Sequence, residues 1–203
     1  MYMKRINALV LIIAGTLLLI TCNKAKPADA AENTTAPALQ NSSAQSSDWY
    51  FAEFERLGFS VFRNYTTFPK IAFYDFANKQ YTIDDFAGKI VLLNIWATWC
   101  PPCRMEMPTI QKLHDAKLSE NFIILAVSTG ENSSTVSSFI KENNYSFPVF
   151  LDPSTNLGAQ LASRGIPTTY IIDKKGRVLA GTIGSRAYDG KEFMKLIERL
   201  SKE

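Results

Sequence analysis

The chain has 203 residues, of which 46% are hydrophobic and 20% charged, a balance typical of a globular domain rather than of a disordered chain. Its formal net charge is +3 at pH 7, and loss of an N-terminal segment that carries Lys4 and Arg5 reduces this by two, to +1. No basic excess then remains to indicate nucleic acid or an anionic membrane surface as the partner.

Residues 1–22 have the layout of a secretory signal peptide. Lys4 and Arg5 precede an apolar run of fifteen residues, and Cys22 follows it closely. The run is shorter than the ~20 residues that a helix needs to cross a bilayer. A cysteine in this place is similar to the lipobox of bacterial lipoproteins, which implies lipid attachment through the Cys22 sulfur. An uncleaved signal anchor is the alternative, and in both cases the rest of the chain lies outside the cytoplasmic membrane.

Residues 23–47 form a predicted disordered tether. They are mostly Ala, Ser, Asn, Thr, Gln and Pro with no apolar periodicity. Such a segment cannot bury enough apolar surface to order itself, so we expect a flexible coil. The remaining residues, 48–203, suit one globular domain with its own core.

Aromatic residues are dense at the start of this domain. Asp48 is placed to cap a short helix that ends at Gly58. Helical intervals separate Phe51, Phe54 and Leu57 within it. We interpret the stripe as packed on the domain's own sheet, since large apolar patches are seldom left exposed. A partner-docking surface is the alternative.

The rest of the domain alternates between predicted strands and helices. Strands are expected at residues 71–76, 80–83, 90–95, 122–127, 149–151, 168–173 and 177–183, the first two of them forming a β-hairpin. Helices are expected from Cys100 through apolar positions up to Leu118, at residues 133–143 and 153–164, and around residues 193–200. This order is typical of an α/β domain in which helices cover both faces of a central sheet.

A cysteine pair, Cys100-Pro101-Pro102-Cys103, joins an apolar strand to the helix that follows. Unpaired backbone N–H groups and the positive end of the helix dipole favour the thiolate form of a cysteine in this place. Because the two prolines carry no N–H, the first donor that the Cys100 sulfur can reach along the chain is the Cys103 N–H. We therefore expect Cys100 to be the nucleophile of thiol–disulfide exchange and Cys103 to be the resolving thiol.

Two other interpretations of the cysteine pair are weaker. A zinc site needs two further Cys or His ligands at suitable spacing. The sequence has one histidine, His114, and one further cysteine, Cys22, which lies in an unrelated segment. A structural disulfide across so short a loop would restrict the unfolded chain little. We therefore expect neither a metal nor a cofactor.

Four separated stretches carry a family resemblance. They are DFAGK at residues 85–89, LNIWATWCPPCR at residues 93–104, Glu106 with Pro108, and GIPTTYIID at residues 165–173. Together they resemble the membrane-tethered TlpA-like and ResA-like thiol:disulfide oxidoreductases. The resemblance covers about residues 71–197. It implies a thioredoxin-like fold with a central mixed sheet, helices on both faces and an N-terminal β-hairpin extension.

The resemblance also implies a substrate-binding set beside the dithiol. Pro167 would be a cis-proline that faces the cysteines, and the Ile166 backbone would pair with an extended substrate segment, as in strand addition. Trp99 and Pro101 complete the set. For Trp99, as for Trp96, packing beneath the dithiol is the favoured interpretation.

Glu106 is the third predicted catalytic residue. It follows Cys103 by three positions, hence on the same helix face and near the sulfurs. In the family that the chain resembles, a glutamate here tunes the cysteines and moves protons during exchange. Asn94 stands where thioredoxin has a buried acid, which Glu106 would replace. A solvated residue in an ion pair is the alternative, but no Lys or Arg lies three or four residues away.

The leading hypothesis is an extracytoplasmic protein-disulfide reductase, membrane-anchored on the periplasmic side, with protein disulfides and a membrane or periplasmic dithiol donor as partners. Clients in the family include the haem-site cysteines of apocytochrome c. The same motif can instead oxidise if its reduced form is over-stabilised.

Two further hypotheses share the fold. A redoxin-type thiol peroxidase needs a Pro-x-x-x-Thr-x-x-Cys setting, whereas this chain has Leu93 in place of the Pro and Ala97 in place of the Thr. A copper chaperone of the thioredoxin-like type needs a C-x-x-x-C pair and a distal histidine, whereas only two residues separate the cysteines here and no His follows Asp115.

Overall fold

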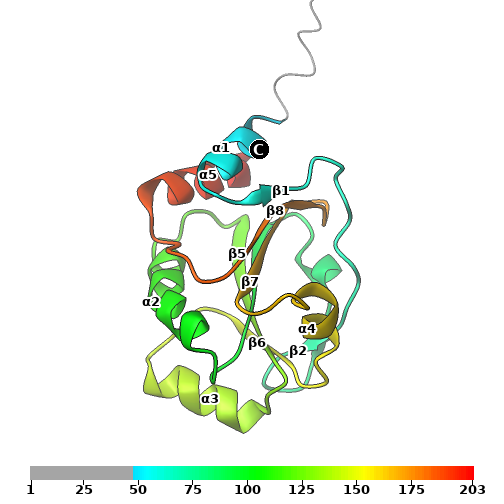
Figure 1. Cartoon of the computed structure of the whole chain (residues 1–203), viewed down its shortest axis with the longest axis vertical. Helices are drawn as coiled ribbons and strands as arrows, with labels where there is room; N and C mark the ends of the chain where they lie inside the picture. The colour runs from blue at the N-terminus through cyan, green and yellow to red at the C-terminus, as the bar shows by residue number, and fades with distance from the viewer. Residues whose placement is uncertain (1–47) are drawn as a thin grey trace, which may run out of the picture. The chain divides into compact units, whose positions relative to one another are not determined.

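The computed structural model describes residues 48–203 (Figure 1). The predicted signal peptide, Cys22 and the predicted tether lie outside the described residues. Between residues 48 and 203, no helix is both long enough and apolar enough to cross a membrane.

A mixed sheet of eight strands forms the centre of the described region, in the order β1-β8-β7-β4-β5-β6-β2-β3. The strands are β1 (Ser60–Val61), β2 (Phe73–Tyr74), β3 (Gln80–Tyr81), β4 (Ile90–Trp96), β5 (Phe122–Thr129), β6 (Val149–Asp152), β7 (Thr168–Ile172) and β8 (Val178–Ile183). The central strand β4 pairs in parallel with β5 and antiparallel with β7. The predicted hairpin is confirmed, since β2 and β3 pair antiparallel.

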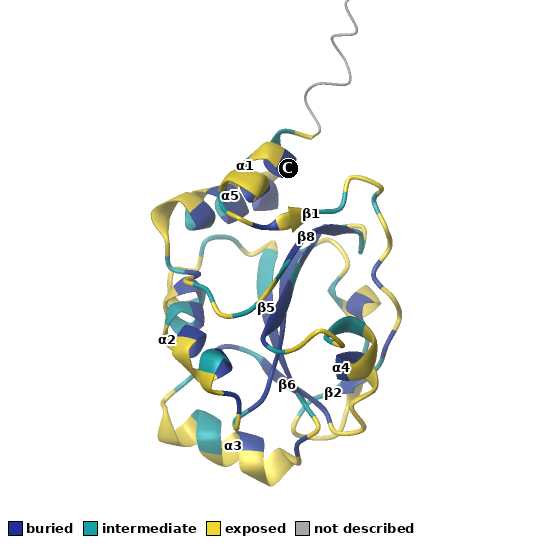
Figure 2. Ribbon diagram, viewed as in Figure 1, coloured by how far each residue is buried: buried dark blue, intermediate teal, exposed yellow. Residues whose placement is uncertain are grey.

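Helices cover both faces of the sheet, as predicted. They are α1 (Trp49–Arg56), α2 (Pro101–Asp115), α3 (Ser133–Glu142), α4 (Asn156–Leu161), α5 (Lys191–Lys202) and a 3₁₀ helix, η1 (Ile83–Phe86). Figure 1 shows α2 on one side of the central strands and α4 on the other. Side chains of β4 alternate between two cores: Ile90 and Leu92 pack with α1, α2 and α5, whereas Val91 and Leu93 pack with α4 and η1. Figure 2 shows these central strands as buried.

The aromatic stripe packs inside the domain, so the packing interpretation is confirmed. Tyr50, Phe51 and Phe54 of α1 are buried. The ring of Phe59 stacks on that of Phe193 in α5, with ring centroids 5.6 Å apart. The segment before the hairpin is therefore a structural part of the domain, and its helix ends as predicted, with Gly58 at a φ of 78°.

Two predicted helices extend several residues too far, the two hairpin strands are shorter than predicted, and one strand was not predicted. The helix at the cysteines ends at Asp115 instead of continuing to Leu118, because Lys117 has a left-handed backbone with φ 44°. The helix expected at residues 153–164 covers only α4. Thr155 has a left-handed backbone with a φ of 58°, so the helix cannot include the residues before it. Strand β1 was not predicted, since two residues carry no periodic pattern.

Candidate active site

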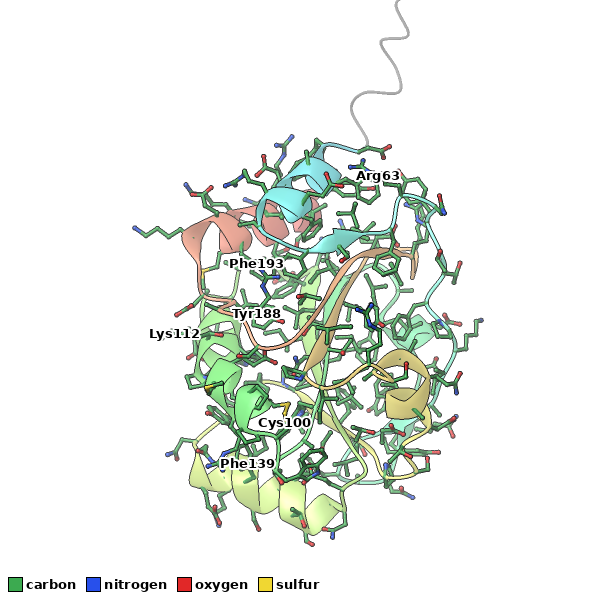
Figure 3. The ribbon with its side chains drawn as sticks, viewed as in Figure 1. Arg63, Cys100, Lys112, Phe139, Tyr188 and Phe193 are labelled. Carbon is green, nitrogen blue, oxygen red and sulfur yellow. A yellow bond between two sulfur atoms is a disulfide. The ribbon has the colours of Figure 1, made fainter. Side chains whose placement is uncertain are left out.

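The dithiol lies where β4 ends and α2 begins. All seven residues of β4 are buried, which fixes the direction in which the chain leaves the sheet. Cys100 is the N-cap of α2, and the Cys103 N–H donates to its sulfur at 3.3 Å, as predicted. The two cysteines form a disulfide, with Cα atoms 5.3 Å apart. Figure 3 labels Cys100 at this end of α2.

The backbone before β7 lies beside the disulfide. The Ile166–Pro167 peptide bond is cis, as predicted. The Cys100 sulfur lies 3.7 Å from the carbonyl oxygen of Ile166. The Pro167 carbonyl accepts a hydrogen bond from the Gly184 N–H at 2.8 Å, which ties this turn to the end of β8. Cys100, Ile166 and Pro167 are therefore brought together, although 66 residues separate the first two.

The two tryptophans of the motif differ in exposure. Trp96 is fully buried, with its ring 5.5 Å from that of Phe139, so packing is confirmed for Trp96. Trp99 is 67% exposed, so packing beneath the dithiol is wrong for Trp99, which lies in the turn beyond the end of β4. A groove of about 450 Å³ begins at Trp99 and Ile166 and continues along α4. Small residues line much of it, including Gly130, Gly158 and Ala162.

Pro101 does not line the groove that begins at Trp99. It is exposed and borders a second groove, between α2 and α3, of about 430 Å³. Met105 is 68% exposed there, and Arg104 lies over the ring of Phe139 at 5.7 Å. The predicted substrate-binding residues Trp99 and Pro101 therefore border two different grooves.

Glu106 is buried behind the dithiol. It lies one helical turn beyond Cys103 on the same buried face of α2, and its side chain is almost inaccessible, with the residue 1% exposed. One carboxylate oxygen accepts from the Asn94 side-chain amide at 2.8 Å, and the other accepts from the Arg186 backbone N–H at 3.2 Å. The solvated ion-pair interpretation is therefore wrong.

Burial shifts the protonation of this carboxyl group. Desolvation raises the pKa of Glu106 to about 7, and the hydrogen bonds from Asn94 and Arg186 oppose that rise without cancelling it. A carboxyl group with this pKa can both accept and release a proton near neutral pH. Of the titratable residues near the dithiol, Glu106 therefore has the property that proton transfer requires.

A polar chain extends from Glu106 into the core. The Asn94 amide nitrogen also donates to the Thr169 hydroxyl at 2.9 Å, and the Tyr188 hydroxyl donates to the same oxygen at 2.7 Å. Burial raises the pKa of Tyr188, which keeps its phenol protonated. The Asn94 carbonyl oxygen is buried and has no hydrogen-bond partner among residues 48–203. Asn94 thus presents its donor, not its acceptor, to the Glu106 carboxylate.

Sequence reasoning missed Thr169, Arg186 and Tyr188. They lie on β7 and in the loop between β8 and α5, and only the folded chain brings them to Glu106. His114, in contrast, lies half-buried in α2 at a distance along the helix from the dithiol. Across the described part of the chain, no group of three or more His, Cys, Asp and Glu residues is arranged to hold a metal ion.

Known proteins share both sequence and fold with this chain. The redoxin family model matches residues 64–192. A protein named thiol-disulfide oxidoreductase ResA from Bacillus cereus is 32% identical over 124 residues, which are 61% of this chain and 72% of the relative. The protein of the same name from Halalkalibacterium halodurans is 34% identical over 125 residues, 61% of this chain and 71% of the relative.

Solved structures agree with these matches. A thiol:disulfide interchange protein from Bacteroides sp. superposes with a TM-score of 0.58 at 25% identity and covers 68% of this chain and 90% of its own. A thiol:disulfide interchange protein of the thioredoxin family from Chlorobium tepidum gives 0.56 at 25% identity, over 67% of this chain and 96% of its own. The thioredoxin-like fold predicted from the sequence is confirmed.

Proposed function

Because the chain belongs to the redoxin family and is a thiol:disulfide oxidoreductase of the ResA type, we propose that Cys100 and Cys103 reduce protein disulfides while Glu106 moves the protons. The observation that carries this proposal is the cysteine pair at the start of α2 with a buried carboxyl group one turn behind it. Protein disulfides are the substrate class of such enzymes.

The first step is attack by the reduced enzyme. The Cys100 thiolate, stabilised by the Cys103 N–H and the end of α2, attacks one sulfur of a substrate disulfide. The substrate S–S bond breaks and a bond between Cys100 and the substrate sulfur forms. The departing substrate sulfur leaves as a thiolate and takes up a proton.

The second step resolves this mixed disulfide. The Cys103 thiol gives its proton to the Glu106 carboxylate and attacks the Cys100 sulfur. The bond between Cys100 and the substrate breaks, and the second substrate sulfur leaves as a thiolate that is then protonated. The substrate has gained two electrons and two protons, and the enzyme is left with the Cys100–Cys103 disulfide that the structure contains.

Ile166, Pro167 and Trp99 would receive the substrate. The Ile166 carbonyl lies beside the sulfur that reacts, and an extended segment running along it would bring its own cysteine to Cys100. The exposed ring of Trp99 and the groove of small residues next to it leave room for that segment. Pro101 would border the substrate at the second groove.

The proposal extends to the location of the enzyme. The chain would be exported and held on the extracytoplasmic, periplasmic side of the membrane, by a lipid on Cys22 or by an uncleaved signal anchor, with residues 23–47 as the tether. A membrane or periplasmic dithiol protein would supply the electrons. The family resemblance suggests the haem-site cysteines of apocytochrome c as one client.

The first experiment measures the reduction potential of the dithiol. The full-length chain in detergent micelles is equilibrated in glutathione or dithiothreitol buffers, and a Cys22→Ser variant confirms that only Cys100 and Cys103 are counted. A value near −270 mV, as in thioredoxin, supports a reductase. A value near −120 mV would make the protein a disulfide-forming oxidant and overturn the proposed direction.

A further inference from the structure

Arg186 connects Glu106 to the end of α1. The backbone N–H of Arg186 donates to a Glu106 carboxylate oxygen at 3.2 Å. The side chain of the same residue extends the other way, to the end of α1. Its guanidinium donates to the carbonyl of Leu57 and, at 3.4 Å, to that of Gly58. One residue thus contacts the buried carboxylate with its backbone and α1 with its side chain.

The contact with α1 is a helix C-cap. Leu57 is the C-cap residue of α1, and the last carbonyls of a helix lack intrahelical partners and carry partial negative charge. A guanidinium donates to both carbonyls at once because its N–H groups form a planar fork. The guanidinium also lies 3.9 Å from the centroid of the Phe59 ring. These contacts give Arg186 a fixed position against α1.

The loop around Arg186 is fixed to α2 as well. The Tyr188 N–H donates to the Thr109 hydroxyl at 3.1 Å, and that hydroxyl donates to the Glu106 carbonyl at 2.7 Å. Tyr188 itself is fully buried. Figure 3 shows Tyr188 next to α2, on the side where Lys112 is labelled. Arg186 is therefore held between the turn of α2 that carries Glu106 and the end of α1.

We propose that Arg186 is a positioning residue for Glu106, and that its anchored guanidinium keeps its own N–H on the carboxylate, so that α1 takes part in setting the proton-transfer group. The inference deepens the proposed function and rests on the role given there to Glu106. Two features that packing alone leaves unexplained thereby gain a role. One is the contact of the Arg186 guanidinium with the carbonyl at the end of α1, and the other is the Arg186 backbone N–H that donates to the buried Glu106 carboxylate.

The charges that face Glu106 are few. On its own helix the titratable neighbour is Cys103, one turn before it. The loop between β8 and α5 contributes Arg186 and the protonated Tyr188. The strands β4 and β7 contribute only the uncharged Asn94 and Thr169. Arg186 is thus the one cation among the described residues that acts on this carboxyl group, and both its N–H and its charge lower the pKa of Glu106 against the effect of burial.

The test measures the titration of Glu106 directly. The full-length chain in detergent micelles, labelled with ¹³C at glutamate side-chain carboxyls, is titrated by NMR in its disulfide form, in which neither cysteine titrates. A Glu106→Gln variant identifies the resonance. Arg186→Gln, which removes the charge and the anchor, should move the midpoint upward by about one pH unit, a tenfold change in the ionisation constant. Arg186→Lys keeps a charge without the fork and should give a smaller upward shift.

A matched control is Lys112→Gln. Lys112 pairs with Asp189 at 2.9 Å and so joins the same loop to α2, but it is exposed and does not act on Glu106. Its removal should leave the Glu106 midpoint unchanged. Melting temperatures are recorded for every variant, because a merely structural role for Arg186 would lower them without moving the midpoint.

The outcomes separate the two proposals. Unchanged midpoints in both Arg186→Gln and Arg186→Lys overturn the positioning role of Arg186. Disulfide exchange by the Glu106→Gln variant with the rate and pH profile of the wild type would instead overturn the proton-transfer role of Glu106, whatever the Arg186 variants do.

Discussion

Glu131 holds Thr98 by both its backbone and its side chain. The Glu131 carboxylate accepts from the Thr98 N–H at 2.8 Å and from the Thr98 hydroxyl. The Ser128 hydroxyl donates to the same carboxylate at 2.7 Å. Glu131 follows β5, and Thr98 precedes Cys100 by two positions, so the end of one strand determines the path of the chain into the dithiol.

Replacing Glu131 with Gln should loosen this path. A Gln amide has one accepting oxygen where the carboxylate has two, so at least one of the three hydrogen bonds is lost or reversed and the others lose their charge assistance, at a cost of about 1–3 kcal/mol of stability. Disulfide exchange should slow at the same time, because the loop that orients Cys100 is no longer fixed. Denaturant unfolding and exchange kinetics measure the two effects. The exposed Glu120→Gln is the control, and an unaffected exchange rate in Glu131→Gln would show that the loop does not depend on this carboxylate.

The two tryptophans of the motif should respond oppositely to truncation. Trp99→Ala should raise KM for a protein disulfide several-fold and leave unfolding nearly unchanged, because the side chain is mostly exposed beside the groove. Trp96→Ala should cost about 3–5 kcal/mol of stability, because its ring is fully buried. Steady-state kinetics and urea unfolding on both variants check the pair. Wild-type KM in Trp99→Ala would remove Trp99 from the substrate-binding set.

The central strands were predictable because their patterns are strong. Continuous apolar runs predicted the strands at residues 90–95 and 122–127, and the structure extends them only at their C-terminal ends. The helix at residues 153–164 was overestimated because helical periodicity contains no information on the left-handed Thr155. The predicted start of this helix is therefore wrong because a single backbone angle, that of Thr155, decides it.

The site divides in the same way. Cys100, Cys103 and Glu106 are close in sequence, so helical spacing was enough to bring them together. Arg186 and Glu131 lie in polar loops, where an arginine or a glutamate looks like any solvated residue. Their importance comes from contacts with residues 80 and 33 positions away, and no local pattern encodes such distances. The comparison with thioredoxin's buried acid did identify Asn94, which is buried and donates to the Glu106 carboxylate.

Glu106→Gln should change the pH dependence of exchange. In the wild type the Glu106 carboxylate accepts the Cys103 proton, so the resolution rate should rise as pH increases through about 7, where this group ionises. The Gln variant cannot accept the proton, and its rate should be about 10²-fold lower at neutral pH and lack that rise. Single-turnover decay of a mixed disulfide, followed by mass spectrometry after acid quench, measures this step alone. A rise through the same pH in the variant would assign it to another group.

Glu106 should also make stability depend on pH, in a direction opposite to that of most carboxylates. Its ordinary pKa of 4.5 applies to the unfolded chain, and the folded value is about 7. Between these values the folded protein holds a proton that the unfolded chain has released, so the stabilisation is complete below pH 4.5 and is lost as pH rises through 7. The difference of about 2.5 pH units corresponds to about 3 kcal/mol.

Urea unfolding of the wild type and Glu106→Gln at several pH values should therefore show the variant gaining about this much stability relative to the wild type as pH rises. The exposed Glu142→Gln is the control, and a constant difference between wild type and Glu106→Gln across the range would mean that Glu106 has the same pKa in the folded protein as in the unfolded chain.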